Sequence, residues 1–350
     1  MTTAKQSVVD TPEEGDDPSR PAAWQRLRSA NTLWIGLVLL ALCVVFGALR
    51  PEAFLTLFTA QTLLIEASVL LVLAVGMTFV IITAGIDLSV GSVLVFAGVV
   101  GAKTMEALSP GGDATDAGWG VIAAGLVVSL LGGGAWGLVN GLLIARARIP
   151  ALIVTLGSFG AALGAAQLIT DGVDVRTVPS ALANTLGSGT SLGVVPNLVL
   201  LAVAVTVLGD LVLRTTRFGR HTYAIGSNAE AARRAGIAVT RHLVLVYLLV
   251  GLLAGLAGFM SLAYFRTTTI SGHSTDNLNA IAAVVLGGTS LFGGLGSVLG
   301  TVIGVFIPAV LTKGFVILHV QAFWQPIAVS VVLVAAVWFD QVRRRARNRS

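Results

Sequence analysis

Six polar side chains lie within or beside long apolar segments, and their chemistry suits a small polar ligand. They are Thr83, Asp87, Asn140, Thr155, Ser158 and Asn279. All but the aspartate carry neutral hydroxyl or amide groups, which fit a polyol such as a sugar better than an ion. We therefore regard these residues as candidates for a substrate pathway. The local alternative is that the hydroxyls bond back to their own helix backbone.

Asp87 stands where one apolar segment turns into the next, in the sequence AGIDLSVG over 84–91. In one role its carboxylate accepts N–H bonds at the start of the next helix, where the helix dipole favours negative charge. In the other role it forms part of a gate or pathway. Residue type and position leave both roles open.

The chain carries no motif for catalysis or for a resident cofactor. It has no phosphate-binding G-x-x-x-x-G-K-[ST], no metal-ligand spacing of His and Cys, and no nucleophile elbow. Its four histidines are far apart, and its one cysteine, Cys43, cannot form an intrachain disulfide. If the protein consumes energy, another chain must supply it.

The basic segment 214–241 holds a second pattern. Ser227, followed three residues later by Glu230, predicts a capping box, and Gly236 predicts a left-handed helix end. The helix between them presents small side chains edged by arginines: Ala231, Ala232 and Ala235, with Arg233 and Arg234. Such a short helix has too little area to fold alone and is shaped to dock into a partner's groove. The alternative is an ordinary solvated loop.

Membrane-spanning helices must position these residues. The chain is 55% hydrophobic and only 11% charged, whereas soluble domains carry about 25% charged residues. The expected fold class is an all-α polytopic membrane protein with about ten transmembrane helices, each of about 20 residues. The predicted spans are 32–49, 60–82, 89–107, 119–144, 150–170, 192–213, 242–265, 278–292, 296–318 and 323–339.

The basic residues predict the orientation. With a cytoplasmic N-terminus, 17 of the 22 Lys and Arg residues fall on the cytoplasmic side, as the positive-inside rule requires. Residues 1–30 are then a disordered cytoplasmic tail, 31–341 the membrane domain, and 342–350 a basic cytoplasmic tail. The same distribution explains the net charge of +5 without nucleic-acid binding.

Glycines interrupt the segments 278–292 and 296–318, so a re-entrant pair would satisfy the same hydropathy. The segments 85–94 and 290–299 are also similar to each other. They indicate either two repeated halves, as in many transporters, or a chance match in a glycine-rich chain.

Glu66 is the acidic residue placed most firmly inside a predicted span. Ion-coupled transporters usually carry carboxylates or histidines along the ion path. One glutamate gives little support for that alternative, and Glu66 could equally bond a neighbouring helix. A third possible class is a membrane receptor or scaffold whose basic loop binds a signalling partner.

Several blocks, in order, resemble the permease subunits of bacterial ATP-binding-cassette (ABC) importers for monosaccharides, of the ribose/xylose/arabinose type. The similarity covers roughly 60–340. Its blocks are GMTFVIITAGIDLSVGS (76–92), VNGLL (139–143), PALIVTLG (150–157), FGRHTYAIGSNAEAARRAGI (218–237) and LNAIAAVVLGGTS (278–290).

This resemblance implies that 214–241 is the cytoplasmic loop that couples the chain to its ATPase. The family's E-A-A-x-x-x-G core falls on Glu230, Ala231, Ala232 and Gly236. Ser227 and Arg233 belong to the same expected coupling surface. The chain lacks the Leu-Pro pair of the longer family motif, which leaves any larger docking footprint in doubt.

The resemblance also implies an alternating-access permease in the bacterial inner membrane, with both termini cytoplasmic. It implies a homodimer, a separate ABC ATPase subunit that binds the ATP, and an extracytoplasmic sugar-binding protein. No cofactor is then expected in this chain. The cargo stays open between a ribose-like or xylose-like sugar and another small polar solute, such as a nucleoside, a branched-chain amino acid or a furanosyl signalling molecule.

Overall fold

The computed structural model describes residues 30–321 apart from Leu192 and Ser274, together with scattered positions between 323 and 334. The described chain is helical, with one short antiparallel pair of strands, β1 (Thr190–Ser191) and β2 (Val195–Pro196). The helices are α2 (Ala30–Leu49), α3 (Pro51–Phe54), α4 (Leu57–Ile82), α5 (Val90–Ala107), α6 (Trp119–Ala145), α7 (Ala151–Thr170), α8 (Ser180–Leu182), α9 (Asn197–Thr215), α10 (Arg217–Ser227), α11 (Ala229–Arg234), α12 (Val239–Phe265), α13 (Asp276–Leu286) and α14 (Val298–Ile317).

Within the described residues, seven helices are long and apolar enough to cross a bilayer: α4, α5, α6, α7, α9, α12 and α14. They confirm seven of the predicted spans, and α2 matches the predicted span 32–49. The fold is therefore that of an all-α polytopic membrane protein. The predicted span 323–339 lies mostly outside the described residues, as do both predicted tails.

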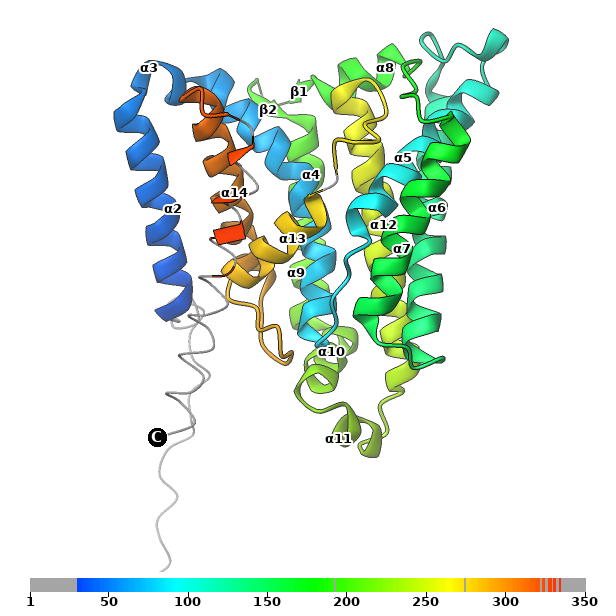
Figure 1. Cartoon of the computed structure of the whole chain (residues 1–350), viewed down its shortest axis with the longest axis vertical. Helices are drawn as coiled ribbons and strands as arrows, with labels where there is room; N and C mark the ends of the chain where they lie inside the picture. Colours follow the sequence, from blue (N-terminus) through cyan, green and yellow to red (C-terminus); the bar gives the residue numbers. More distant parts are fainter. Residues whose placement is uncertain are drawn as a thin grey trace, which may run out of the picture.

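The predicted span 278–292 is wrong, because α13 has only 11 residues. Such a helix rises about 16 Å, against the about 30 Å of a hydrocarbon core. The helix ends before Gly287, and Gly288 has a φ of 87° that a continuing helix excludes. An irregular segment, 266–275, precedes α13 and forms the rest of this crossing (Figure 1).

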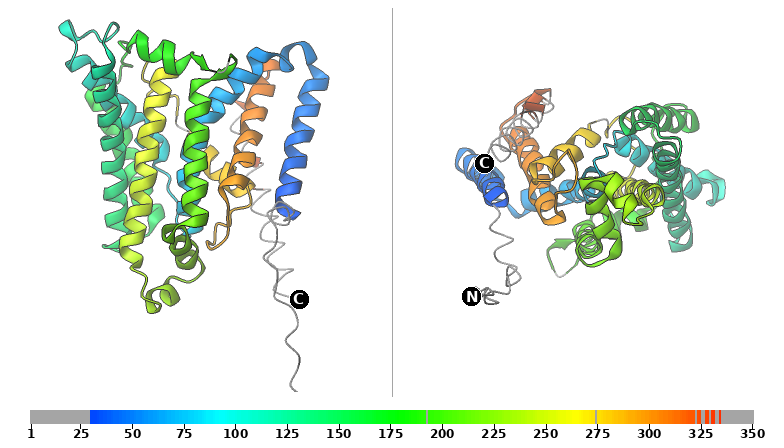
Figure 2. Two further views of the ribbon diagram at one scale, coloured as in Figure 1. Left: turned by 180° about the vertical axis from the view of Figure 1, so that it is seen from behind. Right: turned by 90° about the horizontal axis from the view of Figure 1, so that it is seen from below.

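The long helices run side by side between two faces of the molecule (Figures 1 and 2). One face carries α10 and α11, and the opposite face carries α3, α8 and the strand pair. The centre is α4, whose residues from Ala67 to Ile82 are nearly all buried. We call the face with α10 and α11 the coupling face, after the role that the family resemblance leads us to expect for segment 214–241.

The helices α6 and α12 pack closely because glycines face each other along their contact. A Cβ atom on Gly133 would clash with the carbonyl oxygen of Gly251, and one on Gly137 would clash with that of Tyr247. Small residues allow such close approach, and packing drives helix association in lipid. The glycine patterns of these two spans thus mark a real helix interface.

Two helices begin inside the molecule and meet at their N-termini. The amide nitrogen Nδ2 of Asn277, in the first turn of α13, donates to the carbonyl oxygen of Leu88 over 3.0 Å. A Cβ on Gly91, in the first turn of α5, would lie 2.7 Å from the carbonyl oxygen of His273. The linker 83–89 and the segment 266–275 therefore approach this meeting point from opposite faces (Figure 1).

The similar segments 85–94 and 290–299 do not share a local structure. Ser92 lies inside the first turn of α5, whereas the matching Ser297 is the N-cap of α14 and accepts from the Gly300 N–H. The short sequence match therefore gives no sign of a structural repeat at these two positions.

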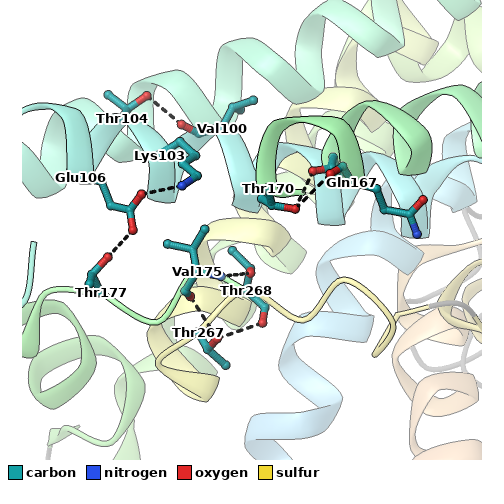
Figure 3. A network of polar contacts seen from close by, with 11 residues as sticks. Val100, Lys103, Thr104, Glu106, Gln167, Thr170, Val175, Thr177, Thr267 and Thr268 are labelled. Atoms are coloured by element: carbon teal, nitrogen blue, oxygen red, sulfur yellow. Dashed lines mark hydrogen bonds and ion pairs between the residues drawn. The ribbon is translucent and has the colours of Figure 1, made fainter. Parts of the chain in front are cut away.

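The face opposite the coupling face is tied together by the polar network of Figure 3. The Val175 N–H donates to the Thr268 hydroxyl over 2.8 Å, and the Thr268 N–H donates to the Val175 carbonyl over 3.0 Å. Glu106 at the end of α5 pairs with Lys103 and accepts from Thr177. The network fixes the start of segment 266–275.

Candidate functional site

The coupling face is built by two short helices that meet at Asn228. This residue has an extended backbone, and its side-chain oxygen accepts from the Ala231 N–H over 2.9 Å, which makes it the N-cap of α11. The predicted cap at Ser227 is wrong, because Ser227 is the last residue of α10. Glu230 forms no capping box and instead pairs with Arg233 at 2.8 Å and Arg234 at 3.3 Å.

The predicted left-handed helix end at Gly236 is confirmed, with a φ of 84°. The Ile237 N–H donates to the Ala232 carbonyl, and the Gly236 N–H donates to the Arg233 carbonyl, both over 3.0 Å. These two bonds form a Schellman motif, which satisfies carbonyls at the helix end. The motif turns the chain sharply back toward α12.

The alanine face is divided between the chain's own packing and solvent. Ala232 is buried against Ile225 and Val239, so it anchors α11 to α10 and α12. Ala231 and Ala235 are exposed, as is Arg233. The expected surface of three alanines is therefore reduced to two alanines edged by arginine.

The end of α10 packs directly against the end of α4 and the loop between α13 and α14. A Cβ on Gly226 would overlap the carbonyl oxygen of Ile82, the last residue of α4. That same oxygen accepts from the Gly294 N–H over 2.9 Å. The Tyr223 hydroxyl donates to the Gly296 carbonyl over 2.7 Å. A displacement of α10 must therefore move the end of α4 and the loop between α13 and α14.

Tyr223 stays protonated as this contact requires. Burial raises the pKa of its hydroxyl, and the nearby charge of Asp210 raises it further, while Arg214 lowers it. Because the pKa lies above the ordinary value near 10, the phenol donates its hydrogen bond at neutral pH.

A chain of buried hydrogen bonds joins three of the candidate pathway residues. Ser158 on α7 donates to the Asn140 Oδ1 on α6, and the Asn140 Nδ2 donates to the Ser89 Oγ over 3.0 Å. Ser89 in turn donates to the Asp87 Oδ1 over 2.6 Å, and its N–H donates to the same oxygen over 2.8 Å. We call these four residues the linker network.

The linker network holds the start of α5 in place. Asp87 does not form the predicted helix cap, because both of its bonds come from Ser89, the N-cap residue of α5, and none from an N–H within the helix. Asp87 is only 2% exposed, and buried polar groups of this kind are costly unless they are hydrogen-bonded. Thr155 lies beside the network, with its hydroxyl 3.4 Å from the Ile86 carbonyl and 2.9 Å from the Ala151 carbonyl of its own helix.

The other two candidates lie elsewhere. Thr83 ends α4 and donates to the Val80 carbonyl over 2.8 Å, which is the local backbone role expected for many hydroxyls. Asn279 lines a separate cavity between α4, α12, α13 and α14. Glu66 lines the same cavity and accepts from Lys313 on α14 over 2.8 Å, so it bonds a neighbouring helix.

Comparison with known proteins decides the family. The family described as the branched-chain amino acid transport system permease component matches residues 59–337. The chain belongs to this permease family. No solved structure matches the permease.

Curated relatives match the permease over most of its length. The ribose import permease protein RbsC of Escherichia coli (strain K12) is 38% identical over 311 residues, which are 88% of this chain and 93% of the relative. The L-arabinose ABC transporter permease protein AraH of Azospirillum brasilense is 34% identical over 345 residues, 98% and 97% of the two chains. The D-allose transport system permease protein AlsC of Escherichia coli (strain K12) is 32% identical over 305 residues, 87% and 90%.

Proposed function

We propose that this chain is the membrane-spanning permease subunit of an ABC importer for a monosaccharide. One observation carries the proposal: relatives named for ribose, arabinose and allose transport match nearly the whole chain at 32–38% identity. The chain supplies the passage through the bilayer, and a separate subunit supplies ATP hydrolysis. A second copy of the chain and an extracytoplasmic sugar-binding protein complete the importer.

The coupling face is the surface that binds the ATPase subunit. The small side chains of Ala231 and Ala235 allow this surface to fit into a groove of the partner. Arg233 supplies a positive charge at the edge of the surface. Motion of α11 passes to α10 through the buried cluster of Ile225, Ala232 and Val239. The close contact between Gly226 and the Ile82 carbonyl then transmits the motion of α10 to α4 and to the linker 83–89.

The linker connects this motion to the middle of the membrane. Linker 83–89 leads from the end of α4 to the linker network, so a shift of α4 changes the position of the α5 N-terminus. This supports alternating access, in which the meeting point of α5 and α13 opens first to one side and then to the other. In this orientation the coupling face is cytoplasmic, as the distribution of basic residues predicts.

Reconstitution tests this function directly. Proteoliposomes that contain the chain, its ATPase subunit and its loaded binding protein should accumulate labelled D-ribose, L-arabinose or D-allose only when ATP is present. L-leucine serves as the comparison substrate because the family description names branched-chain amino acids. Accumulation of leucine and of no sugar would replace the proposed cargo. Uphill transport by the chain alone, or loss of uptake with a protonophore during continued ATP hydrolysis, would reject ATP coupling.

Gly236→Val tests the coupling assignment within that assay. A β-branched side chain resists the φ of 84° at this position, so we expect sugar uptake to fall while the ATPase subunit still hydrolyses ATP. No atom lies within 4 Å of a Cβ at Gly236, so the effect would be conformational. Gly236→Asn is the control, because asparagine tolerates a left-handed backbone. Full uptake by the valine variant would contradict the assignment.

A further inference from the structure

We propose that the cavity between α4, α12, α13 and α14 binds one monosaccharide during its passage, a proposal that rests on the function proposed above. The cavity volume is about 320 Å³. That volume is near the small end of the range of about 300–1,000 Å³ found for small-molecule sites. The residues that matter for binding are Glu66, Tyr264, Phe265, Asp276, Asn279 and Thr312.

The cavity offers polar groups that the protein leaves unused. In the described part of the chain, the Asn279 amide and the hydroxyls of Thr312 and Tyr264 form no hydrogen bond with another protein group. An amide and a hydroxyl can each donate and accept. A sugar presents both kinds of partner on neighbouring carbons, so these three side chains match it in chemistry.

Two carboxylates are held in fixed positions beside these groups. One oxygen of Glu66 accepts from Lys313 over 2.8 Å. One oxygen of Asp276 lies 2.7 Å from the His273 Nδ1, and the His273 Nε2 lies 2.8 Å from the Ser261 hydroxyl. Each carboxylate therefore keeps a second oxygen that can accept from a sugar hydroxyl, and its orientation is set before the ligand arrives.

The charges of the cavity favour a neutral ligand. Lys313 neutralises Glu66 at 2.8 Å, and the imidazole of His273 engages Asp276. A cation would have to compete with these existing partners for the carboxylates, whereas a neutral hydroxyl only adds to them. Both carboxylates thus already have partners within the protein, and a neutral polyol can bind without displacing them.

Apolar groups complete the match to a sugar ring. Tyr264 and Phe265 lie at one side of the cavity with ring centroids 4.8 Å apart, and Pro308 also contributes to the lining. A sugar ring has a C–H surface that packs on such groups while its hydroxyls reach the polar side. A second cavity of about 270 Å³, between α4, α9 and α14, is lined by apolar side chains apart from the hydroxyls of Ser68 and Thr206. It is the natural comparison site.

The cavity lies where a delivered sugar would first meet the interior. Its lining includes Gly272 and His273 from segment 266–275, whose start is fixed by the network of Figure 3 on the face away from α10 and α11. In the proposed orientation this is the side from which a binding protein releases its cargo. Asp276 and Asn277 then link the cavity to the meeting point with α5.

Thiol protection tests occupancy of the cavity. In a Cys43→Ser background, the Ala309→Cys chain, whose new thiol lies in the cavity lining and replaces no polar group, is assembled with its ATPase and binding-protein partners. It is treated with a maleimide in the presence of D-ribose, L-arabinose or D-allose. At a concentration about tenfold above its Kd, at least one sugar should slow modification about tenfold, because the thiol is shielded while the cavity is occupied. Thr206→Cys in the apolar cavity should react at the same rate with and without sugar. Absence of protection at position 309 by all three sugars would overturn the site.

Transport by conservative variants gives the second measurement. Asn279→Ala and Thr312→Val should lower sugar uptake about tenfold each, with ATP hydrolysis stimulated by the binding protein unchanged. Thr206→Val is the matched control and should transport at the wild-type rate. Wild-type uptake by both cavity variants would reject the site and leave the importer function standing. Sugar protection of the thiol at position 309, without any ATP-driven uptake by the wild-type chain, would support the site and reject the importer function.

Discussion

Asn228 shows how one residue sets the break between the two helices of the coupling face. Its extended backbone separates α10 from α11, and its side chain satisfies an N–H at the start of α11. Ser227 and Asn228 are both favourable N-cap residues, so the sequence does not distinguish between them. The choice falls on Asn228 because Gly226 must lie against Ile82, which keeps Ser227 within α10.

A pair of alanine variants checks this assignment. Asn228→Ala should destabilise α11 by about 1 kcal/mol, because it removes the acceptor for the Ala231 N–H. Ser227→Ala should have a smaller effect, since the Ser227 side chain caps no helix. Thermal unfolding and amide hydrogen exchange of α11 measure both. Equal destabilisation by the two variants, or a larger effect at Ser227, would support the capping box instead.

The linker network also shows what residue type can and cannot predict. The selection of Asp87, Asn140 and Ser158 as polar groups within apolar spans found residues that meet in space. It missed Ser89, which links Asp87 to Asn140. Ser89 looks like any serine beside a helix start, and its partner lies 51 residues away. Only the packing of α6 and α7 against the linker reveals the connection.

At the scale of elements, α10 is the rigid connection between the coupling face and the spanning helices. Its contacts reach the end of α4 and the loop that contains Gly294 and Gly296. The contact with Gly296 depends on a single phenol hydroxyl, so it can be removed with little change in volume.

Tyr223→Phe should reduce sugar uptake several-fold while the ATPase activity of the complex is retained. The variant loses the 2.7 Å bond to the Gly296 carbonyl but keeps the ring, so the expected loss of stability is only about 1 kcal/mol. Uptake and ATP hydrolysis measured on the same proteoliposomes give the ratio. An unchanged ratio of sugar transported to ATP hydrolysed would show that this bond carries no motion.

The glycine contact between α6 and α12 gives an element-scale prediction about stability. Gly137→Ala should lower the unfolding temperature in detergent, because the new methyl group would clash with the Tyr247 carbonyl. Gly160→Ala on α7 is the matched control, since a Cβ there has no neighbour within 4 Å, and alanine favours a helix over glycine. A Gly137→Ala chain as stable as the Gly160→Ala chain would show that the helices can separate without loss.

Hydropathy predicted the elements well wherever a crossing is a single helix. The helices α4, α6, α7 and α12 begin and end within a few residues of the predicted limits. It failed at the crossing that contains α13, because Gly287 and Gly288 end the helix before the apolar pair Leu291 and Phe292, which the predicted span had included. The α9 helix also begins later than predicted, directly after Pro196.

The whole molecule has two chemically different faces, and its orientation in the membrane follows from them. The coupling face carries Arg233 and Arg234, whereas the opposite face carries the polar network of Figure 3 and the exposed loop after α5. By the positive-inside rule, we propose that the first face is cytoplasmic.

Cysteine labelling in intact cells checks that orientation. In a Cys43→Ser background, Asp116→Cys should react with a membrane-impermeant maleimide added outside, because Asp116 is exposed on the loop between α5 and α6. Asn228→Cys should react only after the cells are opened. The two positions are controls for each other, and the inverted pattern would reverse the assignment of the faces.

Two crossings of the molecule are interrupted by irregular segments, 83–89 before α5 and 266–275 before α13, and these segments are the places where it can deform. A continuous helix such as α4 cannot lengthen without breaking its backbone hydrogen bonds. In the irregular segment 83–89, Thr83, Ala84 and Gly85 donate backbone bonds to the end of α4. The rest of the segment is anchored by the side chains of Asp87 and Ser89. We therefore expect a displacement of the end of α4 to shift the N-terminus of α5 and leave both helices intact. The deformation is then confined to the irregular segments 83–89 and 266–275.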